Sequence, residues 1–437
     1  MVNGFVGLLE PGCTVSPNFK QLTSQLIPPV GTFQAVELFS HCFGNGPSEA
    51  LAGELRQFGH KPVGFFVLNV KSHRDLPFYL IYGSILPQGN TSDRLSRAAD
   101  ILRSEGFIMR YSLVWLLAAV GAAAAATHTL YVCGATSKGY VVGAPLLPSG
   151  LFLRDAGGSW KQLGFKHPFI KAVDYDPRDP NILYIAAGNG CIRSADGGRS
   201  WRITTGWDMT ELLDVSVDAH QPDHIYIGLP DGIGFSPDQG RTWTRRDAGI
   251  RRKFTQAVRV DRAQGGRVLA GTELGVFLSE DEGRSWREVG AAGLMVTHLA
   301  QSSHDPRQWL ATTQRGGLFA TSDRGLTWNA VNGVPADRTL YMAAFDPRQA
   351  GRLLVCGWGP GVLVSEDGGR SWQARSTGLP SRKVWSAGFD PDVPGRLYAS
   401  VHEEAVFVSP DSGRTWKRSG LEGSIVSSLA FVPEAGR

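Results

Sequence analysis

The sequence predicts an all-β fold and, within that class, a seven-bladed β-propeller. A turn motif of the form Ser194-Ala-Asp-Gly-Gly-Arg-Ser-Trp201 occurs seven times, and its central aspartates lie 41 to 44 residues apart. A short apolar run precedes the motif and alternating residues follow it, which is typical of two strands joined by a tight turn. A period of ~40–45 residues built from short strands is the signature of a propeller blade. The seven aspartates are Asp155, Asp196, Asp238, Asp281, Asp323, Asp367 and Asp411.

We call these seven segments the box turns, and their residue types predict a structural role. Asp and Ser or Thr side chains bond backbone amides inside a turn, and Gly takes a backbone angle that other residues resist. The Trp ring is expected to pack against the neighbouring hairpin, so that each box turn fastens the outer hairpin of its blade. The seven aspartates are therefore not expected to be catalytic carboxylates.

A second motif, Asp-Pro, alternates with the box turns. It stands at Asp176-Pro177, Asp346-Pro347 and Asp390-Pro391, each time after an apolar, strand-like run. Together the two motifs predict four strands in each blade. Strand A leads to the Asp-Pro turn and strand B, and a short loop then leads to strand C, the box turn and strand D.

The box turns resemble Asp-box repeats, also called BNR repeats. Their combination with Asp-Pro and a following Tyr, as in Asp390-Pro391 and Tyr398, is similar to three groups of propellers. These are the photosystem II assembly and stability factors, the xyloglucanase-type glycoside hydrolases and the luminal domains of sortilin-like receptors. The resemblance covers roughly residues 128–437. It implies the fold more specifically than the activity, because one fold hosts many functions.

The two ends of the repeat region predict how the ring closes. Residues 425–432 have the pattern of a strand A, but no box turn follows them, and the first box turn lacks a clear strand A. Pairing the C-terminal strand with the first blade gives seven blades and hides the edges that an open array would expose. The first blade holds extra residues between Cys133 and Gly150.

The composition agrees with this fold. Among 437 residues, 54 Gly and 12 Trp fit a body rich in turns and closed by aromatic rings. A net charge of +4 is small for this length and does not suggest a nucleic acid partner. Five cysteines form no disulfide scaffold. Cys133, Cys191 and Cys356 are expected to be buried thiols, and one bridge among them is left open.

Residues 109–127 predict export of the propeller. Met109-Arg110 precedes an apolar stretch that ends in Ala122–Ala126, with several Ala-x-Ala sites, as in a secretory signal peptide. In one interpretation Met109 is the true start and residues 1–108 are an over-extension of the gene. In the other, 109–127 is a signal anchor and 1–108 stays inside. Both place the propeller in the periplasm or outside the cell. Within 1–108, residues 65–70 suggest a strand and 93–102 a short amphipathic helix.

Candidate binding residues come from the loops at one end of the ring. The box turns and Asp-Pro turns lie at one end, so the B–C loops and D–A connections lie at the other, around the channel mouth. Aromatic and basic residues there predict binding of an acidic protein surface or a polypeptide segment, because Arg recognises carboxylates with two hydrogen bonds. The candidates are Trp207, Arg251, Arg252, Lys253, Arg338, Trp358, Arg382 and Lys383.

An enzymatic alternative rests on acidic residues in the same loops. Glycoside hydrolysis needs two carboxylates that face each other across the sugar. Asp208, Glu211 and Glu273 are weak candidates, and nothing in the sequence singles out a pair. Xyloglucanase-type enzymes use two propellers whereas this chain holds one, and the Arg-Ile-Pro motif of sialidases is absent. No nucleotide, zinc or serine-hydrolase motif is present, so no cofactor and no metal site is predicted.

The sequence therefore predicts an extracytoplasmic binding or assembly scaffold for a protein partner. Its resemblance to the photosystem II assembly factors implies that this partner is a membrane-assembly client. The alternative is a carbohydrate-active glycoside hydrolase with a glycan ligand.

Overall fold

The computed structural model describes residues 127–434, with the exception of 140, 142–144, 146 and 165. It also describes the backbone of three earlier strands. The chain divides into two compact units, residues 1–118 and 119–437. In the first unit, β1 (Gly53–Phe58), β2 (Phe65–Lys71) and β3 (Pro77–Gly83) form an antiparallel sheet in the order β1-β2-β3. The strand predicted at 65–70 is confirmed by β2. The helix predicted at 93–102 and residues 109–126 lie outside the described residues.

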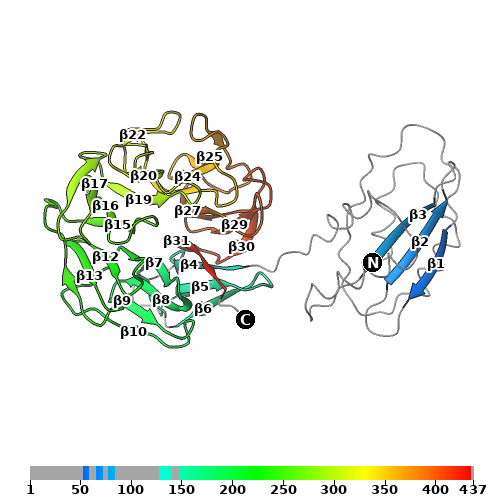
Figure 1. The fold of residues 1–437 in the computed structure, drawn as a ribbon, viewed down its shortest axis with the longest axis horizontal. Helices are drawn as coiled ribbons and strands as arrows, with labels where there is room; N and C mark the ends of the chain where they lie inside the picture. Colours follow the sequence, from blue (N-terminus) through cyan, green and yellow to red (C-terminus); the bar gives the residue numbers. More distant parts are fainter. Residues whose placement is uncertain are drawn as a thin grey trace. The chain divides into compact units, whose positions relative to one another are not determined.

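The second unit consists of seven antiparallel four-stranded sheets arranged in a ring (Figure 1), so the predicted seven-bladed propeller is confirmed. From strand A to strand D, blade 1 is β31 (Ser424–Pro433), β4 (His128–Thr136), β5 (Ser149–Arg154) and β6 (Trp160–Leu163). Blade 2 is β7 (Ile170–Asp176), β8 (Asp179–Ala187), β9 (Gly190–Ser194) and β10 (Arg202–Ile203), and blade 3 is β11 (Asp214–Val217), β12 (Ile225–Leu229), β13 (Gly232–Ser236) and β14 (Thr244–Arg245).

The remaining blades repeat the same order. Blade 4 is β15 (Thr255–Val260), β16 (Val268–Thr272), β17 (Gly275–Ser279) and β18 (Arg287–Gly290), and blade 5 is β19 (Val296–Gln301), β20 (Trp309–Thr313), β21 (Leu318–Thr321) and β22 (Asn329–Ala330). Blade 6 is β23 (Leu340–Phe345), β24 (Leu353–Gly357), β25 (Gly361–Ser365) and β26 (Gln373–Ala374), and blade 7 is β27 (Val384–Phe389), β28 (Leu397–Val401), β29 (Ala405–Ser409) and β30 (Lys417–Gly420). Among the residues with a described structure, no helix is long and apolar enough to cross a membrane.

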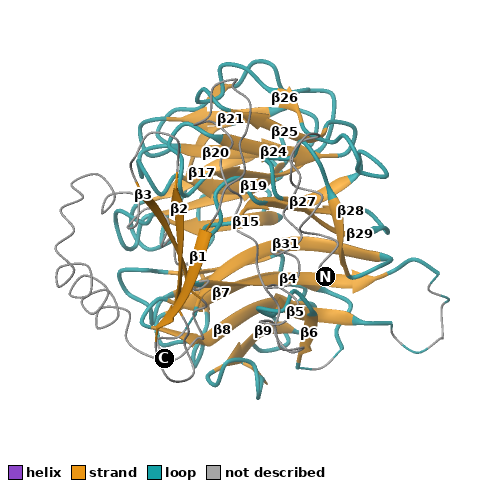
Figure 2. Ribbon diagram, turned by 90° about the vertical axis from the view of Figure 1, so that its right-hand side faces the viewer, coloured by secondary structure: helices purple, strands orange, loops and turns teal. Residues whose placement is uncertain are grey.

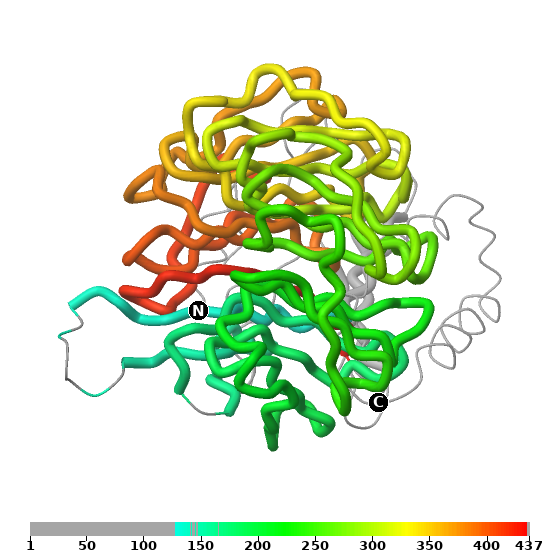
Figure 3. Tube along the Cα trace, turned by 90° about the vertical axis from the view of Figure 1, so that its left-hand side faces the viewer, coloured from blue at the N-terminus to red at the C-terminus, as the bar shows by residue number. Residues whose placement is uncertain are grey.

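The ring closes as predicted, through the C-terminal strand. β31 pairs antiparallel with β4, from Ser424 opposite Thr136 to Pro433 opposite His128. Figure 2 shows β31 running between β27 of the last blade and β4, and Figure 3 shows the two chain segments side by side. Blade 1 therefore combines strands from both ends of the repeat region, and its inner edge is not left unpaired. The extra residues predicted in blade 1 form the long connection between β4 and β5.

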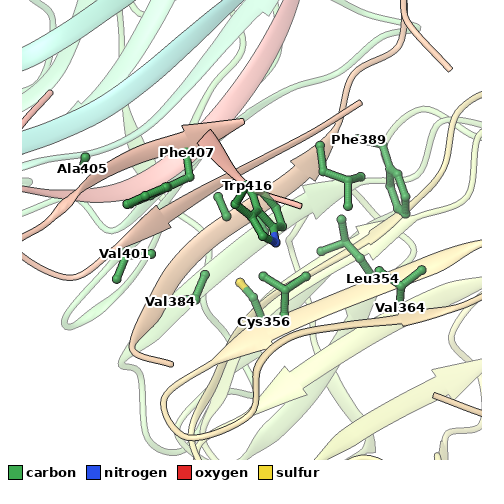
Figure 4. Close-up of a cluster of buried hydrophobic side chains, with 13 residues drawn as sticks. Leu354, Cys356, Val364, Val384, Phe389, Val401, Ala405, Phe407 and Trp416 are labelled. Carbon is green, nitrogen blue, oxygen red and sulfur yellow. The ribbon is translucent and has the colours of Figure 1, made fainter. Parts of the chain in front are cut away.

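The core lies between adjacent blades. Strands B and C are buried along their whole length in several blades, as in β12 and β24, because a neighbouring blade covers each face of the sheet. Between blades 6 and 7, Leu354, Cys356 and Val364 pack against Val384, Phe407 and Trp416 (Figure 4). The D strands are short and largely exposed, since they form the outer rim of the ring.

The box turns have the internal hydrogen bonds that their residue types predict. In blade 6, Asp367 Oδ1 accepts the backbone N–H groups of Arg370 and Ser371 at 3.0 and 2.9 Å, and Oδ2 accepts the Ser371 hydroxyl at 2.6 Å. Ser365 Oγ in turn accepts the N–H of Gly369 at 2.8 Å. These bonds, led by that of the Ser371 hydroxyl, lower the pKa of Asp367 to about 2. In the degenerate first copy, Asp155 accepts the Ser159 N–H.

The Trp of the box turn also links neighbouring blades. Trp416 of blade 7 donates its indole N–H to the carbonyl oxygen of Arg375 in blade 6, at 2.8 Å. Trp286 of blade 4 makes the same bond to Arg246 of blade 3, also at 2.8 Å. Trp286 also donates to Gly283 O of its own box turn, at 3.1 Å. The ring therefore fastens its own box turn, as predicted, and in addition joins its blade to the preceding one.

The cysteines of the propeller are free and buried. Cys133, Cys191 and Cys356 belong to blades 1, 2 and 6, and burial raises the pKa of each thiol to about 12. They are packing residues, and the disulfide left open by the sequence is not formed.

Candidate functional site

One end of the ring carries all of the candidate binding and catalytic residues. The A–B and C–D turns lie at one end of an antiparallel four-stranded blade, and the B–C turns and D–A connections lie at the other. Backbone hydrogen bonds join these loops between blades. The Trp358 N–H donates to Thr339 O at 3.0 Å, the Gly359 N–H to Arg382 O at 3.0 Å, and the His402 N–H to Lys383 O at 2.8 Å.

Four aromatic side chains meet at the B–C turns of blades 6 and 7, and we call them the aromatic cluster: Tyr341, Trp358, Trp385 and His402. The rings of Tyr341 and Trp385 lie 4.3 Å apart, centre to centre, at 33°. Trp358 stands edge-on to both, at 6.1 and 5.4 Å. His402 closes the group at 5.2 Å from Trp358. All four are half-buried, so part of each ring remains accessible.

Hydrogen bonding defines the polar atoms of this cluster. The Trp385 Nε1–H donates to His402 Nδ1 at 2.9 Å. An indole N–H can only donate, so Nδ1 is the acceptor and any ring N–H of His402 must be at Nε2. The Nε1–H of Trp358 is buried and has no partner among the described residues. A buried donor without a partner costs about 1–3 kcal/mol, so a ligand oxygen that reached it would be favoured.

Three cations border the aromatic cluster, and the sequence predicted each of them. Lys383 Nζ lies 5.6 Å from the centre of the Trp358 ring, within cation–π range. Gly359 has φ of 102°, and a Cβ at this position would lie 3.1 Å from Cδ of Arg338. The Arg338 stem therefore lies across the blade 6 turn because this residue is glycine. Arg338 contacts Asp337 at 3.2 Å, whereas no described carboxylate pairs with Arg382 or Lys383.

A β-bulge puts Tyr341 and Trp385 at this end of their strands. In six of the seven blades the register of strand A shifts by one residue near its start, and the extra residue is left out of the ladder. Bulges turn a side chain away from the regular alternation and are frequent next to binding sites. The bulged residues are Lys171, Gln256, Thr297, Tyr341, Trp385 and Ser427. Sequence reasoning placed His402 in a B–C loop at this end without making it a binding candidate, and it missed Tyr341 and Trp385. The signal that was present is the shared phase of Tyr341 and Trp385 in consecutive blades.

The predicted basic triplet at the blade 3 to blade 4 connection is compensated by acids. Arg251 pairs with Glu288 at 3.5 Å, Arg252 with Glu273 at 3.8 Å, and Lys253 with Asp247 at 2.9 Å. These are exposed or half-exposed pairs of small energetic value, but they neutralise the local charge. The triplet is therefore less suited to an acidic ligand than Arg382 and Lys383.

The candidate catalytic carboxylates do not form a facing pair with the aromatic cluster. Glu273 is engaged by Arg252 in blade 4, and Asp208 and Glu211 are exposed in the connection between blades 2 and 3. Trp207, in that same connection, is 97% exposed and stands apart from Trp358 in blade 6. Among the described residues no three His, Cys, Asp or Glu side chains are arranged to hold a metal ion.

Strand A carries charged and polar groups in blades 2 to 5. Asp214 of blade 3 forms an ion pair with Arg259 of blade 4 and accepts the Val258 N–H at 2.9 Å. Asp174 of blade 2 accepts the Val217 N–H at 2.8 Å. Burial, with a smaller contribution from Arg259, lowers the pKa of His298 to about 3, so this imidazole stays neutral over a wide pH range. Asp174 and Asp214 thus have partners that link one blade to the next.

Comparison with known proteins identifies the fold class. No family model and no curated protein matches the chain. Among solved structures, a GH74 xyloglucanase from Xanthomonas campestris is similar with a TM-score of 0.53 and 19% identity, over 62% of this chain and 51% of that one. The chain thus spans about half the length of that enzyme. This likeness supports the propeller fold alone.

Two further structures are similar at lower scores. YCF48 from Cyanidioschyzon merolae matches with a TM-score of 0.48 and 16% identity, over 63% of this chain and 96% of that one. A structure of YCF48 bound to D1 peptide matches with a TM-score of 0.45 and 17% identity, over 57% and 81% of the two chains. The sheet topology makes the protein a seven-bladed β-propeller, and it carries an aromatic and basic surface at one end of blades 6 and 7.

Proposed function

We propose that the protein is an extracytoplasmic scaffold that binds a polypeptide segment of a protein partner at the aromatic cluster and its bordering cations. The observation that carries this proposal is the coincidence of four half-buried aromatic rings with Arg382 and Lys383, which have no described carboxylate partner. Aromatic rings and Arg are the residues that contribute most of the energy in protein interfaces.

The chemistry of the site indicates the kind of segment. Stacked and edge-on rings accept apolar side chains or the flat faces of peptide groups. The neighbouring cations favour a carboxylate, from an acidic side chain or a chain terminus. We therefore expect an extended segment with at least one carboxylate and one large apolar side chain.

The cellular context of this proposal comes from the sequence. The segment 109–127 has the form of a signal peptide or signal anchor, which supports export. The recurring hydrogen bonds of the box turns support membership among Asp-box propellers. On the resemblance to photosystem II assembly factors, we propose that the partner is a membrane-assembly client.

A glycoside hydrolase is the second candidate, and one observation favours it. The Tyr341–Trp385 pair offers ring faces on which a sugar could stack, and the chain is similar in fold to a xyloglucanase. Against it, the candidate acids Asp208, Glu211 and Glu273 lie on other blades than the aromatic cluster. Glu403 and Glu404 follow His402 in the blade 7 turn, but Ser137 engages Glu403, and Lys138 and Arg418 engage Glu404.

The test compares the two ligand classes on one protein. The purified chain is applied to an array of 15-residue peptides that vary in acidic and aromatic content, and to xyloglucan oligosaccharides, with reducing-end release measured in parallel. We expect binding to acidic, aromatic peptides that weakens with added salt, and no release of reducing ends. Hydrolysis of xyloglucan, or binding of glycans alone, would overturn the proposal.

A further inference from the structure

A carboxylate in blade 7 holds the beginning of the propeller. Asp392 Oδ2 accepts the backbone N–H of Thr127 at 2.8 Å and that of His128 at 2.9 Å. Its Oδ1 accepts the Thr127 hydroxyl at 2.5 Å and contacts His128 Nδ1 at 2.9 Å. The carbonyl of Thr127 accepts the Glu434 N–H at 2.8 Å, next to the end of the closing strand. Thr127 is thus fixed from both sides at the point where the ring closes.

Asp392 differs in chemistry from its counterparts in the other blades. The equivalent A–B turn position is Arg178, His220, His304 or Arg348 in four blades, and each of these side chains reaches the following blade as a hydrogen-bond donor. The acceptors are Asp223 and the backbone oxygens of Arg262, Asp346 and Pro391. In blade 7, at the junction with β4, the residue at this position is instead Asp392, a carboxylate that accepts hydrogen bonds.

The groups that face Asp392 are compatible with a positive charge. His128 lies on β4, Arg348 donates to the Asp392 backbone oxygen from blade 6, and the exposed Glu434 follows β31. The Asp392 side chain is 12% exposed. Burial opposes its ionisation, but the hydrogen bonds from Thr127 and His128 outweigh this and keep the pKa of Asp392 below its usual value. The carboxylate is therefore charged at neutral pH.

The sequence before Thr127 is Ala124-Ala125-Ala126, which provides small residues at positions −1 and −3 of a signal peptidase site. Several bonds in this alanine run satisfy that rule. Cleavage of the Ala126–Thr127 bond by water leaves a carboxylate on Ala126 and an α-ammonium on Thr127. That ammonium would stand where Asp392 already accepts the Thr127 N–H, so a hydrogen bond from an uncharged amide to the carboxylate would become an ion pair without movement of the strand.

We propose that Ala126–Thr127 is the processing site of this protein, and that Asp392 is a built receptor for the new α-ammonium of Thr127. The inference rests on the export part of the proposed function and is independent of the ligand. An ordinary α-amino group has a pKa of about 7.7–8.0, and an ion pair raises it. Because the folded-state pKa is raised, the stabilisation is present below pH ~8 and is lost as the pH rises through the folded value.

The experiment begins with the protein as it is produced. The 437-residue chain is expressed from Met1, and in parallel from Met109, in a Gram-negative host, and the intact mass and amino-terminal peptide of the exported protein are determined. We expect a chain that starts at Thr127. A different first residue, or an uncleaved chain from both starts, would overturn the proposed site.

The second measurement tests the receptor. The pKa of the Thr127 α-amine is obtained from the pH dependence of its competitive acetylation, in the wild type, in Asp392→Asn and in the control His128→Gln. We expect a raised pKa in the wild type and the control, and the ordinary value in Asp392→Asn. An ordinary pKa of the Thr127 α-amine in the wild type would contradict the proposed role of Asp392. If Asp392→Asn does not fold, the wild-type pKa alone decides. Failure of peptide binding in a protein that starts at Thr127 would affect only the proposed ligand.

Discussion

The same end of the ring presents two different surfaces, one at blades 3 and 4 and one at blades 6 and 7. Both are built from B–C turns and D–A connections. At blades 3 and 4, Arg252 and Lys253 pair with Glu273 and Asp247, acids of the same group of loops. At blades 6 and 7, Arg382 and Lys383 lack such partners and border the aromatic cluster. The difference teaches that a basic run is not by itself a binding surface, because acids contributed by other strands decide what charge remains.

The largest expected effect is loss of binding when the aromatic cluster is opened. Trp385→Ala removes the ring that stacks on Tyr341 and the donor to His402, so we expect peptide affinity to fall by about 30-fold or more, as for a central interface Trp. Isothermal titration with the best array peptide measures it. Trp207→Ala is the matched control, since this Trp lies at the same end but is almost fully exposed. Equal losses in the two variants would mean that the aromatic cluster is not the binding surface.

The second effect compares the two basic groups directly. Arg382→Glu with Lys383→Glu should weaken binding of an acidic peptide by roughly tenfold, because charges that face the ligand are reversed. Arg251→Glu with Arg252→Glu should change affinity little, since these cations are already paired with Glu288 and Glu273. Titrations at two salt concentrations provide the measurement. A larger loss of affinity from Arg251→Glu with Arg252→Glu would indicate that the peptide binds at the connection between blades 3 and 4.

The fold could be predicted from the sequence because its signals are local and repeated. Each box turn contains its own hydrogen-bonding partners, so the spacing of Asp367 and its six counterparts reveals the blades, and the unmatched segment at 425–432 reveals the closure. The packing of Trp416 on the preceding blade could not be predicted in this way, because the acceptor on Arg375 is 41 residues away.

The candidate site was only partly predictable for the same reason. Trp358, Arg338, Arg382 and Lys383 stand in loops whose position follows from the repeat. Trp385 falls inside a predicted strand. A β-bulge, which no residue type in the sequence predicts, turns its side chain out of the ladder. The compensation of Arg252 by Glu273 depends on how two loops meet in space.

The third effect concerns the opposite end, where the two halves of the ring are alike. Asp367→Asn in blade 6 and Asp238→Asn in blade 3 should lower the melting temperature by similar, small amounts, because each carboxylate accepts both the backbone N–H and the hydroxyl of the Ser or Thr four residues later. In Asp238 these bonds outweigh burial and also lower the pKa. A lowered folded-state pKa gives stability above the unfolded value of about 3.9, which is lost as the pH falls towards 2.

Thermal unfolding at pH 7 and near pH 2 tests this equivalence. The wild type should lose more stability on acidification than either variant, and the three curves should converge near pH 2. A box variant that behaved differently in blades 3 and 6 would show that the asymmetry of the ring is not confined to the loop end.

The smallest expected effect is that of removing a candidate catalytic acid. Glu273→Gln keeps the shape of the side chain and removes the charge that Arg252 contacts, so peptide affinity should change by less than about twofold and any release of sugar should be unaltered. Its ion pair is half-exposed, and such pairs contribute about 0–1 kcal/mol. Glu288→Gln, which disturbs the neighbouring pair with Arg251, is the matched control. Turnover present in the wild type and in Glu288→Gln but abolished in Glu273→Gln would make blade 4 the active side of the ring and the aromatic cluster a secondary surface.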